Sequence, residues 1–371
     1  MASTLKSSVS LDHAKFKNQD SSLKSFMKKI EEEFIPFSMT LEITLRCNLR
    51  CHHCYNFDRE LPKLQHDLRP ELNPQEIYKI IDEISDAGCL NLTLTGGEAL
   101  IHPHFFDFVR YARNKHMALT LKSNGVLLDQ DKVKNLINAE VMDMEISLYG
   151  ASALTHDAFT RATGSFEKTL TGIKTAKWAG VKTAINYVLT RHNYQELEKM
   201  LEWSEAWGIT LNIDPHLTRR YDGTLTSLDN RLNREQLVEV YAGPLSATLP
   251  AADLDPQRSV QCGCALAHGA ISSRGDVYPC IGAPIPAGNI REQPFAEIWF
   301  HSPVLNRIRH LQLDDFKTCK PCPHRPYCRR NSGVAYLNSG DYTGPDPWTC
   351  MEAEIIHTQN EKKTSPHAVT S

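Results

Sequence analysis

The sequence predicts an α/β fold: a parallel sheet of six β/α units, closed or partly closed, followed by a small cysteine-rich domain. Strand-like and amphipathic segments alternate between residues 39 and 213, which favours right-handed β/α units. Glycines stand where the intervening helices should end, at Gly88, Gly180 and Gly208. Ten of the eleven cysteines fall into two groups, at 47–54 and 262–350. A metal-binding or cluster-binding function for both groups follows, because a reducing compartment disfavours disulfides.

Composition excludes several function classes. The chain has 371 residues, enough for one large and one smaller domain. Its 41 basic and 44 acidic residues give a net charge of −3, which offers no electrostatic basis for binding nucleic acid or an anionic membrane. No apolar run approaches the ~18 residues of a membrane span, and the N-terminus lacks the apolar region of a signal peptide. We therefore expect a cytoplasmic protein without nucleic-acid or membrane partners.

The chain divides into five expected segments. They are a flexible N-terminal segment with one short helix (1–37), the β/α core (38–223), a connector (224–258), the cysteine-rich domain (259–352) and a C-terminal tail (353–371). The short helix is expected near 22–30, packed on the barrel rim. The connector contains one expected helix at 234–241. We expect no winged-helix peptide-binding module in the N-terminal segment, because its roughly 35 residues are too few for one.

Hydrophobic periodicity locates the elements of the core. Strands are expected at 39–45, 91–95, 118–122, 142–148, 182–189 and 210–213. Helices are expected at 74–87, 103–115, 130–139, 166–179 and 194–207. Pro74 and Pro103 suit the first positions of two of these helices. Functional residues should then lie at the carboxyl ends of the strands, and the polar segment 214–223 is expected to contact substrate.

The first cysteine group directly follows the first strand. Cys47, Cys51 and Cys54 have C-x3-C-x2-C spacing, so their thiolates can hold three irons of a 4Fe–4S cluster. The fourth iron would stay open for a small molecule. The alternative is a zinc site completed by His52 or His53, although neighbouring residues on a tight loop rarely all reach one ion. Cys89, outside both groups, is interpreted as a small buried hydrophobic residue.

Polar or glycine-rich turns follow the next strands. Gly96-Gly97-Glu98 ends the second strand, and its glycines allow a close backbone approach. The third strand ends in Ser123-Asn124-Gly125, which by itself indicates an ordinary turn.

Together, Cys47-x3-Cys51-x2-Cys54-Tyr55 and Gly96-Gly97-Glu98 resemble the radical S-adenosylmethionine (SAM) enzymes. The resemblance implies a partial (β/α)6 barrel whose open iron chelates the amino and carboxylate groups of SAM. Reductive cleavage would then give methionine and a 5′-deoxyadenosyl radical that abstracts hydrogen from substrate. The Gly-Gly-Glu motif would contact the SAM amino group, and Arg161 would either pair with the carboxylate or be solvated. The resemblance places SAM contacts at Tyr55, Gly96, Gly97, Glu98, Ser123, Asn124, Ser147, Arg161 and Leu189.

The second cysteine group has seven members in fewer than 90 residues, which indicates a metal-binding domain, with two zinc sites as the alternative. A hairpin is expected at 270–280. Behind a radical SAM barrel, the group resembles a SPASM domain, which carries auxiliary iron–sulfur clusters. The resemblance gives one complete ligand set, namely Cys319, Cys322, Cys328 and Cys350. A second set would contain Cys262, Cys264 and Cys280.

That second set departs from the family pattern. Relatives place a further cysteine shortly after the one matching Cys328, whereas this chain has Arg329-Arg330-Asn331-Ser332-Gly333. Neither Asn331 nor Ser332 is a good soft ligand for iron. We therefore expect one or two auxiliary clusters, the incomplete one having an open iron, a different cluster type or no cluster. An open iron there could bind substrate.

Enzymes with this layout mostly modify ribosomally made peptides, so the resemblance implies a peptide maturase of the pyrroloquinoline quinone type. It would form a crosslink or oxidise a side chain, with an external electron donor and a separate leader-peptide-binding protein. No catalytic residue is assigned. The alternatives are a small-molecule substrate such as a tetrapyrrole, as in haem d1-type synthesis, a sulfatase-type maturase, and a non-catalytic metal-binding protein. Ile281-Gly282-Ala283 after Cys280 argues against the sulfatase type, which places an acidic residue there.

Overall fold

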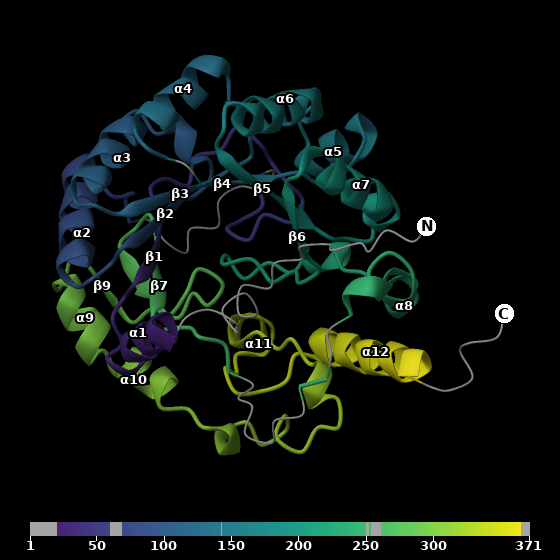
Figure 1. Cartoon of the computed structure of the whole chain (residues 1–371). Helices are drawn as coiled ribbons and strands as arrows, with labels where there is room; N and C mark the ends of the chain where they lie inside the picture. The colour runs from purple at the N-terminus through teal and green to yellow at the C-terminus, as the bar shows by residue number, and fades with distance from the viewer. Residues whose placement is uncertain (1–20, 60–68, 142, 250–251, 254–260, 365–371) are drawn as a thin grey trace.

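Six parallel strands form the core of the computed structural model, which describes residues 21–59, 69–141, 143–249, 252–253 and 261–364 (Figure 1). Neighbouring strands pair in the order β6-β5-β4-β3-β2-β1. Their bounds are β1 Ser38–Glu42, β2 Asn91–Thr95, β3 Ala118–Ser123, β4 Asp143–Ser147, β5 Lys182–Val188 and β6 Thr210–Asp214. The predicted parallel β/α core is confirmed, and β6 forms an edge, so the barrel is partial.

Helices cover the outer face of this curved sheet (Figure 1). They are α2 Pro74–Asp86, α3 Phe105–Asn114, α4 Gln130–Asn138, α5 Ala153–Thr160, α6 Ser165–Trp178 and α7 Leu197–Trp207. Helix α2 begins as predicted, because Asn73 and Glu76 form a reciprocal capping box around Pro74. Helix α3 begins two residues later than predicted, since the chain first makes a 3-10 turn at Ala99–Ile101 that the Glu98 side chain caps.

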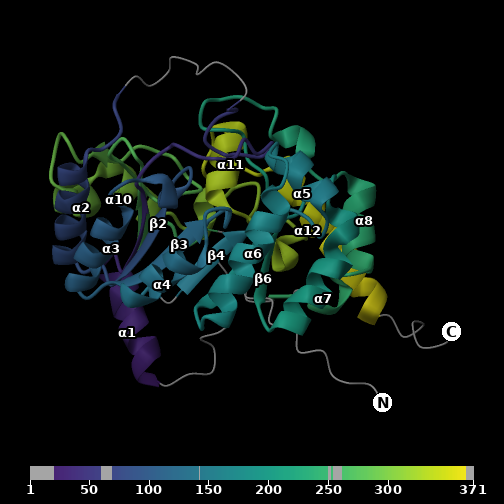
Figure 2. The same cartoon turned by 90° about the horizontal axis from the view of Figure 1, so that it is seen from above.

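The core lies between the sheet and these helices. Four isoleucines on one face of α2 (Ile77, Ile80, Ile81, Ile84) are fully buried, as are alternate residues of the strands. The predicted N-terminal helix is α1 (Ser21–Glu32), where Phe26 contacts Phe37 just before β1. Figure 2 shows α1 at the end of the barrel opposite α11 (Ser332–Ser339). The expected flexibility of the N-terminal segment concerns, before α1, residues 1–20, which lie outside the described residues.

The predicted hairpin is present and also extends the barrel sheet. Strand β7 (His268–Ile271) pairs antiparallel with β8 (Asp276–Tyr278), which pairs with β9 (Gly288–Asn289). On its other side β7 pairs in parallel with β1, with Ser38 opposite His268. Sequence reasoning did not predict this long-range pairing. It attaches the second cysteine group directly to the edge of the core that carries the first.

Four α-helices follow the hairpin in the described residues, namely α9 Phe295–His301, α10 Pro303–Arg309, α11 and α12 Pro347–Thr364. Helix α12 packs against the connector helix α8 (Arg234–Ala242) and runs without interruption past the expected boundary at residue 352. Within the described part of the chain, the helices are all too short or too polar to cross a membrane.

Candidate active site

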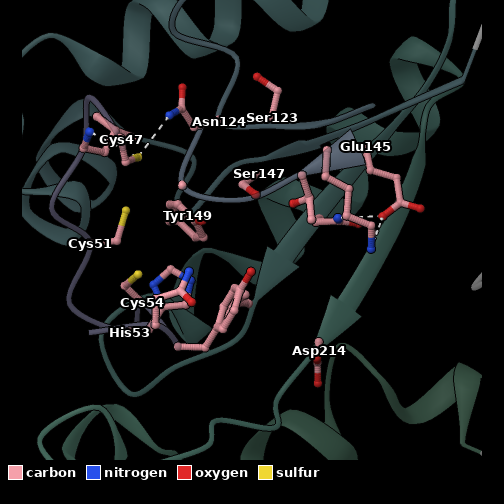
Figure 3. Close-up of a pocket in the computed structure, with 18 of the residues that line it drawn as sticks. Cys47, Cys51, His53, Cys54, Ser123, Asn124, Glu145, Ser147, Tyr149 and Asp214 are labelled. Atoms are coloured by element: carbon pink, nitrogen blue, oxygen red, sulfur yellow. Dashed lines mark hydrogen bonds and ion pairs between the residues drawn. The ribbon is translucent and has the colours of Figure 1, made fainter. Parts of the chain in front are cut away.

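A cavity of about 550 Å³ opens at the carboxyl ends of the barrel strands (Figure 3). Every core strand after β1 contributes to its wall, and the cysteine loop after β1 closes one side. Nine of the residues predicted from the sequence line it, namely Cys47, Cys51, Cys54, Tyr55, Gly96, Gly97, Ser123, Asn124 and Ser147. The tertiary structure thus brings the first cysteine group and most of the expected SAM contacts to one cavity.

The three thiols of the cysteine loop fit an iron–sulfur cluster. Burial raises the pKa of Cys51 well above its usual range, and the neighbouring Cys54 and Cys47 raise it further. These crowded thiols lose their protons readily only when a bound cation such as iron takes the place of the protons. Among the described residues, no three His, Cys, Asp or Glu side chains are placed so that they could bind a single metal ion. A cubane does not require that arrangement, because each cysteine binds a different iron.

A buried arginine, Arg220, hydrogen-bonds to the backbone of the cysteine loop. The Arg220 side chain is only 1% exposed. Its guanidinium donates hydrogen bonds to the carbonyl oxygens of His52 (2.6 Å) and Cys54 (3.1 Å), and lies 3.4 Å from a carboxylate oxygen of Asp58. Segment 214–223, expected to contact substrate, therefore also fixes the backbone between the second and third cysteines. No motif in the sequence indicated this role.

The two glycines after β2 allow the chain to approach itself. A Cβ atom on Gly96 would lie 2.1 Å from the carbonyl oxygen of Thr44, and one on Gly97 would lie 2.3 Å from that of Arg46. The backbone N–H of Gly97 donates to Thr44 O at 2.7 Å. The resemblance predicted that these glycines contact SAM. The close approach observed is to the segment that leads into the cysteine loop.

Glu98 supports the site from within the protein. Its carboxylate accepts hydrogen bonds from the Ser123 hydroxyl (3.0 Å), the Asn124 backbone N–H (2.8 Å) and the Leu100 backbone N–H (3.2 Å). Burial raises its pKa despite these donors. Glu98 lies outside the cavity wall and positions Ser123 and Asn124, which belong to it. Its contact with the SAM amino group stays a prediction.

Arg161 and Leu189 also lie outside the cavity wall. Arg161 follows α5 in a left-handed conformation, and its guanidinium contacts His52 (2.9 Å) and Asp58 (3.0 Å) behind the cysteine loop. Leu189 is fully buried after β5. Their contacts with SAM stay predictions.

Sequence reasoning missed a polar ladder across the cavity wall, formed by Lys122 of β3, Glu145 of β4, Asn186 of β5 and Asn212 of β6. Glu145 pairs with Lys122 at 3.0 Å and accepts from Asn186 at 2.9 Å, and Asn186 accepts from Asn212 at 2.9 Å. Burial tends to raise the pKa of Glu145, but Lys122 and Asn186 hold it below its usual value. The signal in the sequence that could have revealed this ladder is the polar side chains at strand positions that face the cavity.

The segment 214–223, expected to contact substrate, contributes His216 to the cavity wall after β6, but the ion pair of His216 was not predicted. Its imidazole lies 3.2 Å from Asp214 and 3.0 Å from Glu352 of α12, the latter contact being an ion pair without aligned hydrogen-bond geometry. Tyr241 of α8 donates to the other oxygen of Glu352 at 2.5 Å. Burial alone would lower the pKa of His216, but the carboxylates of Glu352 and Asp214 outweigh it and raise it to about 10.

This ion pair predicts a pH-dependent stability. The pKa of His216 is about 10 in the folded protein and 6.5 in a model peptide, so its contribution is fully present below pH 6.5 and is lost as the pH rises through about 10. We expect His216→Asn to lower the unfolding midpoint most near pH 6.5 and least near pH 10. His104→Asn, at an exposed imidazole, is the control. An equal effect of His216→Asn at both pH values would contradict the prediction.

Both predicted auxiliary ligand sets come together in space. Cys319, Cys322, Cys328 and Cys350 all line one small cavity of about 30 Å³ between the loops that precede α11 and the start of α12. In the other set, Cys264 Sγ lies 3.0 Å from Cys262 Sγ and 3.2 Å from Cys280 Sγ. A bound cluster would have to separate these three sulfur atoms.

Two family models match the chain, the radical SAM superfamily over residues 41–204 and the SPASM iron–sulfur cluster-binding domain over 262–323. The chain combines a radical SAM domain with a SPASM domain. It is therefore an enzyme that uses a 4Fe–4S cluster and SAM, and its SPASM domain binds auxiliary iron–sulfur clusters. These assignments replace the zinc and non-catalytic alternatives.

The relatives of this radical SAM enzyme are named for two different activities, heme synthesis and mycofactocin maturation. It is 29% identical to the AdoMet-dependent heme synthase of Methanosarcina barkeri over 340 residues, covering 84% of this chain and 96% of that one. It is also 29% identical to the mycofactocin maturase MftC of Mycobacterium tuberculosis over 338 residues, covering 84% and 82%. The fold matches that of Streptococcus suis SuiB bound to the precursor peptide SuiA, with a TM-score of 0.63, 15% identity, and coverage of 89% and 80%.

Proposed function

We propose that this enzyme is a peptide maturase that crosslinks or oxidises a side chain of a ribosomally made peptide. Cys47, Cys51 and Cys54 would hold the 4Fe–4S cluster, which would supply the electron for reductive cleavage of SAM to the 5′-deoxyadenosyl radical that abstracts hydrogen from substrate. The supporting observation is the size and polarity of the cavity. About 550 Å³ is a volume for one small-molecule ligand, and SAM would take the part beside the cysteine loop. The remainder suits one side chain of an extended peptide better than a macrocycle.

The chain's own residues give this substrate a polar surface. Asn186 and Asn212 use only part of their hydrogen-bonding capacity within the ladder, since each carboxamide has two N–H donors and one acceptor oxygen. Their remaining groups can bind a peptide amide in the cavity. The named activity of the mycofactocin maturase and the peptide bound by SuiB support the same substrate class.

Tetrapyrrole modification is the second proposal, because the heme synthase relative matches at the same identity and over almost its full length. A porphyrin intermediate would need a wide apolar cleft. Much of the cavity wall is instead polar or charged, including Lys122, Glu145, Asn212, Asp214 and His216. We therefore favour the peptide.

The partners and location complete the proposal. An external donor would supply the electron for SAM cleavage, and a separate protein would present the leader peptide. We propose a cytoplasmic location, where a reducing environment keeps eleven cysteines available for iron.

The deciding experiment is a mass spectrum. The anaerobically reconstituted enzyme is reduced with SAM and a short peptide encoded beside its gene, and in parallel with a propionate-bearing porphyrin. A mass loss of about two hydrogens from the peptide would establish crosslinking or dehydrogenation. An unchanged peptide, with a modified porphyrin and 5′-deoxyadenosine accumulating, would refute the peptide proposal in favour of the tetrapyrrole.

The ladder gives a mutational test of substrate binding. We expect Asn212→Ala to raise the KM for peptide by about 3- to 10-fold, the value of one neutral hydrogen bond. The slow SAM cleavage without peptide should not change, because Asn212 is proposed to bind the peptide and not SAM. Asn114→Ala, at an exposed position on α3, is the matched control. An unchanged KM in Asn212→Ala would remove the ladder from the substrate site.

A further inference from the structure

The first auxiliary site has only three cysteine ligands. Cys262, Cys264 and Cys280 lie in mutual contact through Cys264. In a 4Fe–4S cluster each iron takes one protein ligand, so three thiolates leave one iron without a protein partner. The chain has no cysteine between 329 and 333, and the structure shows which side chain faces the thiols instead.

The residues at the expected place of the missing cysteine have other roles. The Asn331 carboxamide caps α11 by accepting hydrogen bonds from the backbone N–H groups of Gly333 (2.8 Å) and Val334 (3.1 Å). The Ser332 hydroxyl accepts from the Arg330 guanidinium at 2.6 Å. A Cβ atom on Gly333 would lie 2.1 Å from the carbonyl oxygen of Gly282, so this position admits no side chain.

Tyr342 faces the three thiols. Its hydroxyl lies 4.0 Å from Cys262 Sγ, and the three cysteines all interact electrostatically with it. Helix α11 ends at Gly340 in the left-handed conformation (φ +77°), which turns the chain back toward the site. Arg330 fixes the returning segment by donating to the carbonyl oxygens of Tyr342 (2.5 Å) and Gly344 (2.7 Å).

Burial and the three neighbouring cysteines raise the pKa of the Tyr342 hydroxyl, which favours its protonated form. The Ser332 hydroxyl hydrogen-bonds to it, and the same hydroxyl accepts from the Arg330 guanidinium. The hydrogen bond from Ser332 acts in the opposite direction to burial, and a bound iron cation would replace the phenol proton, as metal ions do for coordinating thiols. Phenolate is an established iron ligand, as the tyrosine ligand of catalase haem illustrates.

We propose that Tyr342 is the fourth protein ligand of the first auxiliary cluster and binds, through its phenolate oxygen, the iron that the three cysteines leave open. Loading the cluster breaks the Tyr342 O–H bond, forms an O–Fe bond and releases the proton to solvent, with no change in oxidation state. This assignment needs only the SPASM domain and is independent of the substrate. Tyr342 would occupy the open coordination position that was expected to be able to bind substrate. Substrate would therefore bind in the barrel cavity.

The test compares Tyr342→Phe with Tyr336→Phe, a matched change at a tyrosine on α11. Each protein is reconstituted anaerobically with SAM present, so that the open iron at the cysteine loop is occupied. Resonance Raman spectra of wild type and Tyr336→Phe should show iron–phenolate vibrations that Tyr342→Phe lacks. Added cyanide should change the cluster EPR signal of Tyr342→Phe and leave that of wild type unchanged.

Three results would overturn the assignment. The first is a wild-type spectrum without phenolate vibrations, and the second is a cyanide response in wild type equal to that of Tyr342→Phe. The third is a wild-type iron content that falls about four atoms per chain below the content expected for three cubanes. If Tyr342→Phe does not fold, Ser332→Ala tests the same proposal. Removing the hydroxyl that supports the phenolate should shift the phenolate vibrations while iron content is retained, and an unshifted spectrum would contradict the assignment.

Discussion

Cys51→Ala is expected to abolish 5′-deoxyadenosine formation. Cys51 is the middle thiol of the loop that lines the cavity. The other two thiols, of Cys47 and Cys54, each bind one iron of their own and cannot also bind the iron of Cys51. Loss of an outer-shell partner already costs 10–100-fold in metal affinity or activity, so loss of a direct ligand should cost more than about 100-fold. The measurements are 5′-deoxyadenosine by liquid chromatography and iron per chain, which should fall by up to about four atoms.

Cys89→Ala is the matched control for this experiment. The Cys89 thiol is buried in the core and its sulfur hydrogen-bonds to the carbonyl oxygen of Asn91, away from both cysteine groups. It should retain its iron and its SAM cleavage. Undiminished cleavage in Cys51→Ala would refute the role of the loop in holding the SAM-binding cluster.

Arg220→Met is expected to loosen the cysteine loop without removing any thiol. The substitution keeps an apolar stem of similar length but leaves the carbonyl oxygens of His52 and Cys54 without their donor. It also removes a cation beside Asp58, which keeps its ion pair with Arg161. Breaking a buried ion pair from one side costs about 3–5 kcal/mol. We expect a cost near the lower bound, because Arg161 still compensates the carboxylate.

Iron loading and anaerobic urea unfolding together measure this effect. Arg220→Met should lose most of the iron of the cysteine loop and show a lower unfolding midpoint. Arg234→Met should change neither, because its pair with Glu354 lies on the surface. A variant of Arg220 that loads iron normally would show that the loop holds its shape without the guanidinium.

The sequence by itself determined the features that depend on local patterns. Hydrophobic periodicity located the six core strands and five of the six helices around them to within a few residues, because alternating burial on each strand and one apolar face on most helices are written into neighbouring positions. It did not predict α5. Cysteine spacing identified both cluster-binding groups for a related reason, since ligands on one short loop must have a fixed separation. The motif Gly96-Gly97-Glu98 was found in the same way.

Only the tertiary structure decided the contacts between distant segments. Pairing of β7 with β1, the hold of Arg220 on a loop more than 160 residues earlier, and the ladder across four strands all depend on which elements become neighbours. Tyr342 belongs to the same class, because its place beside Cys262 follows from a turn after α11 and from no spacing rule. Such contacts join residues that are unremarkable in their own sequence neighbourhoods, and burial gives them their energetic weight.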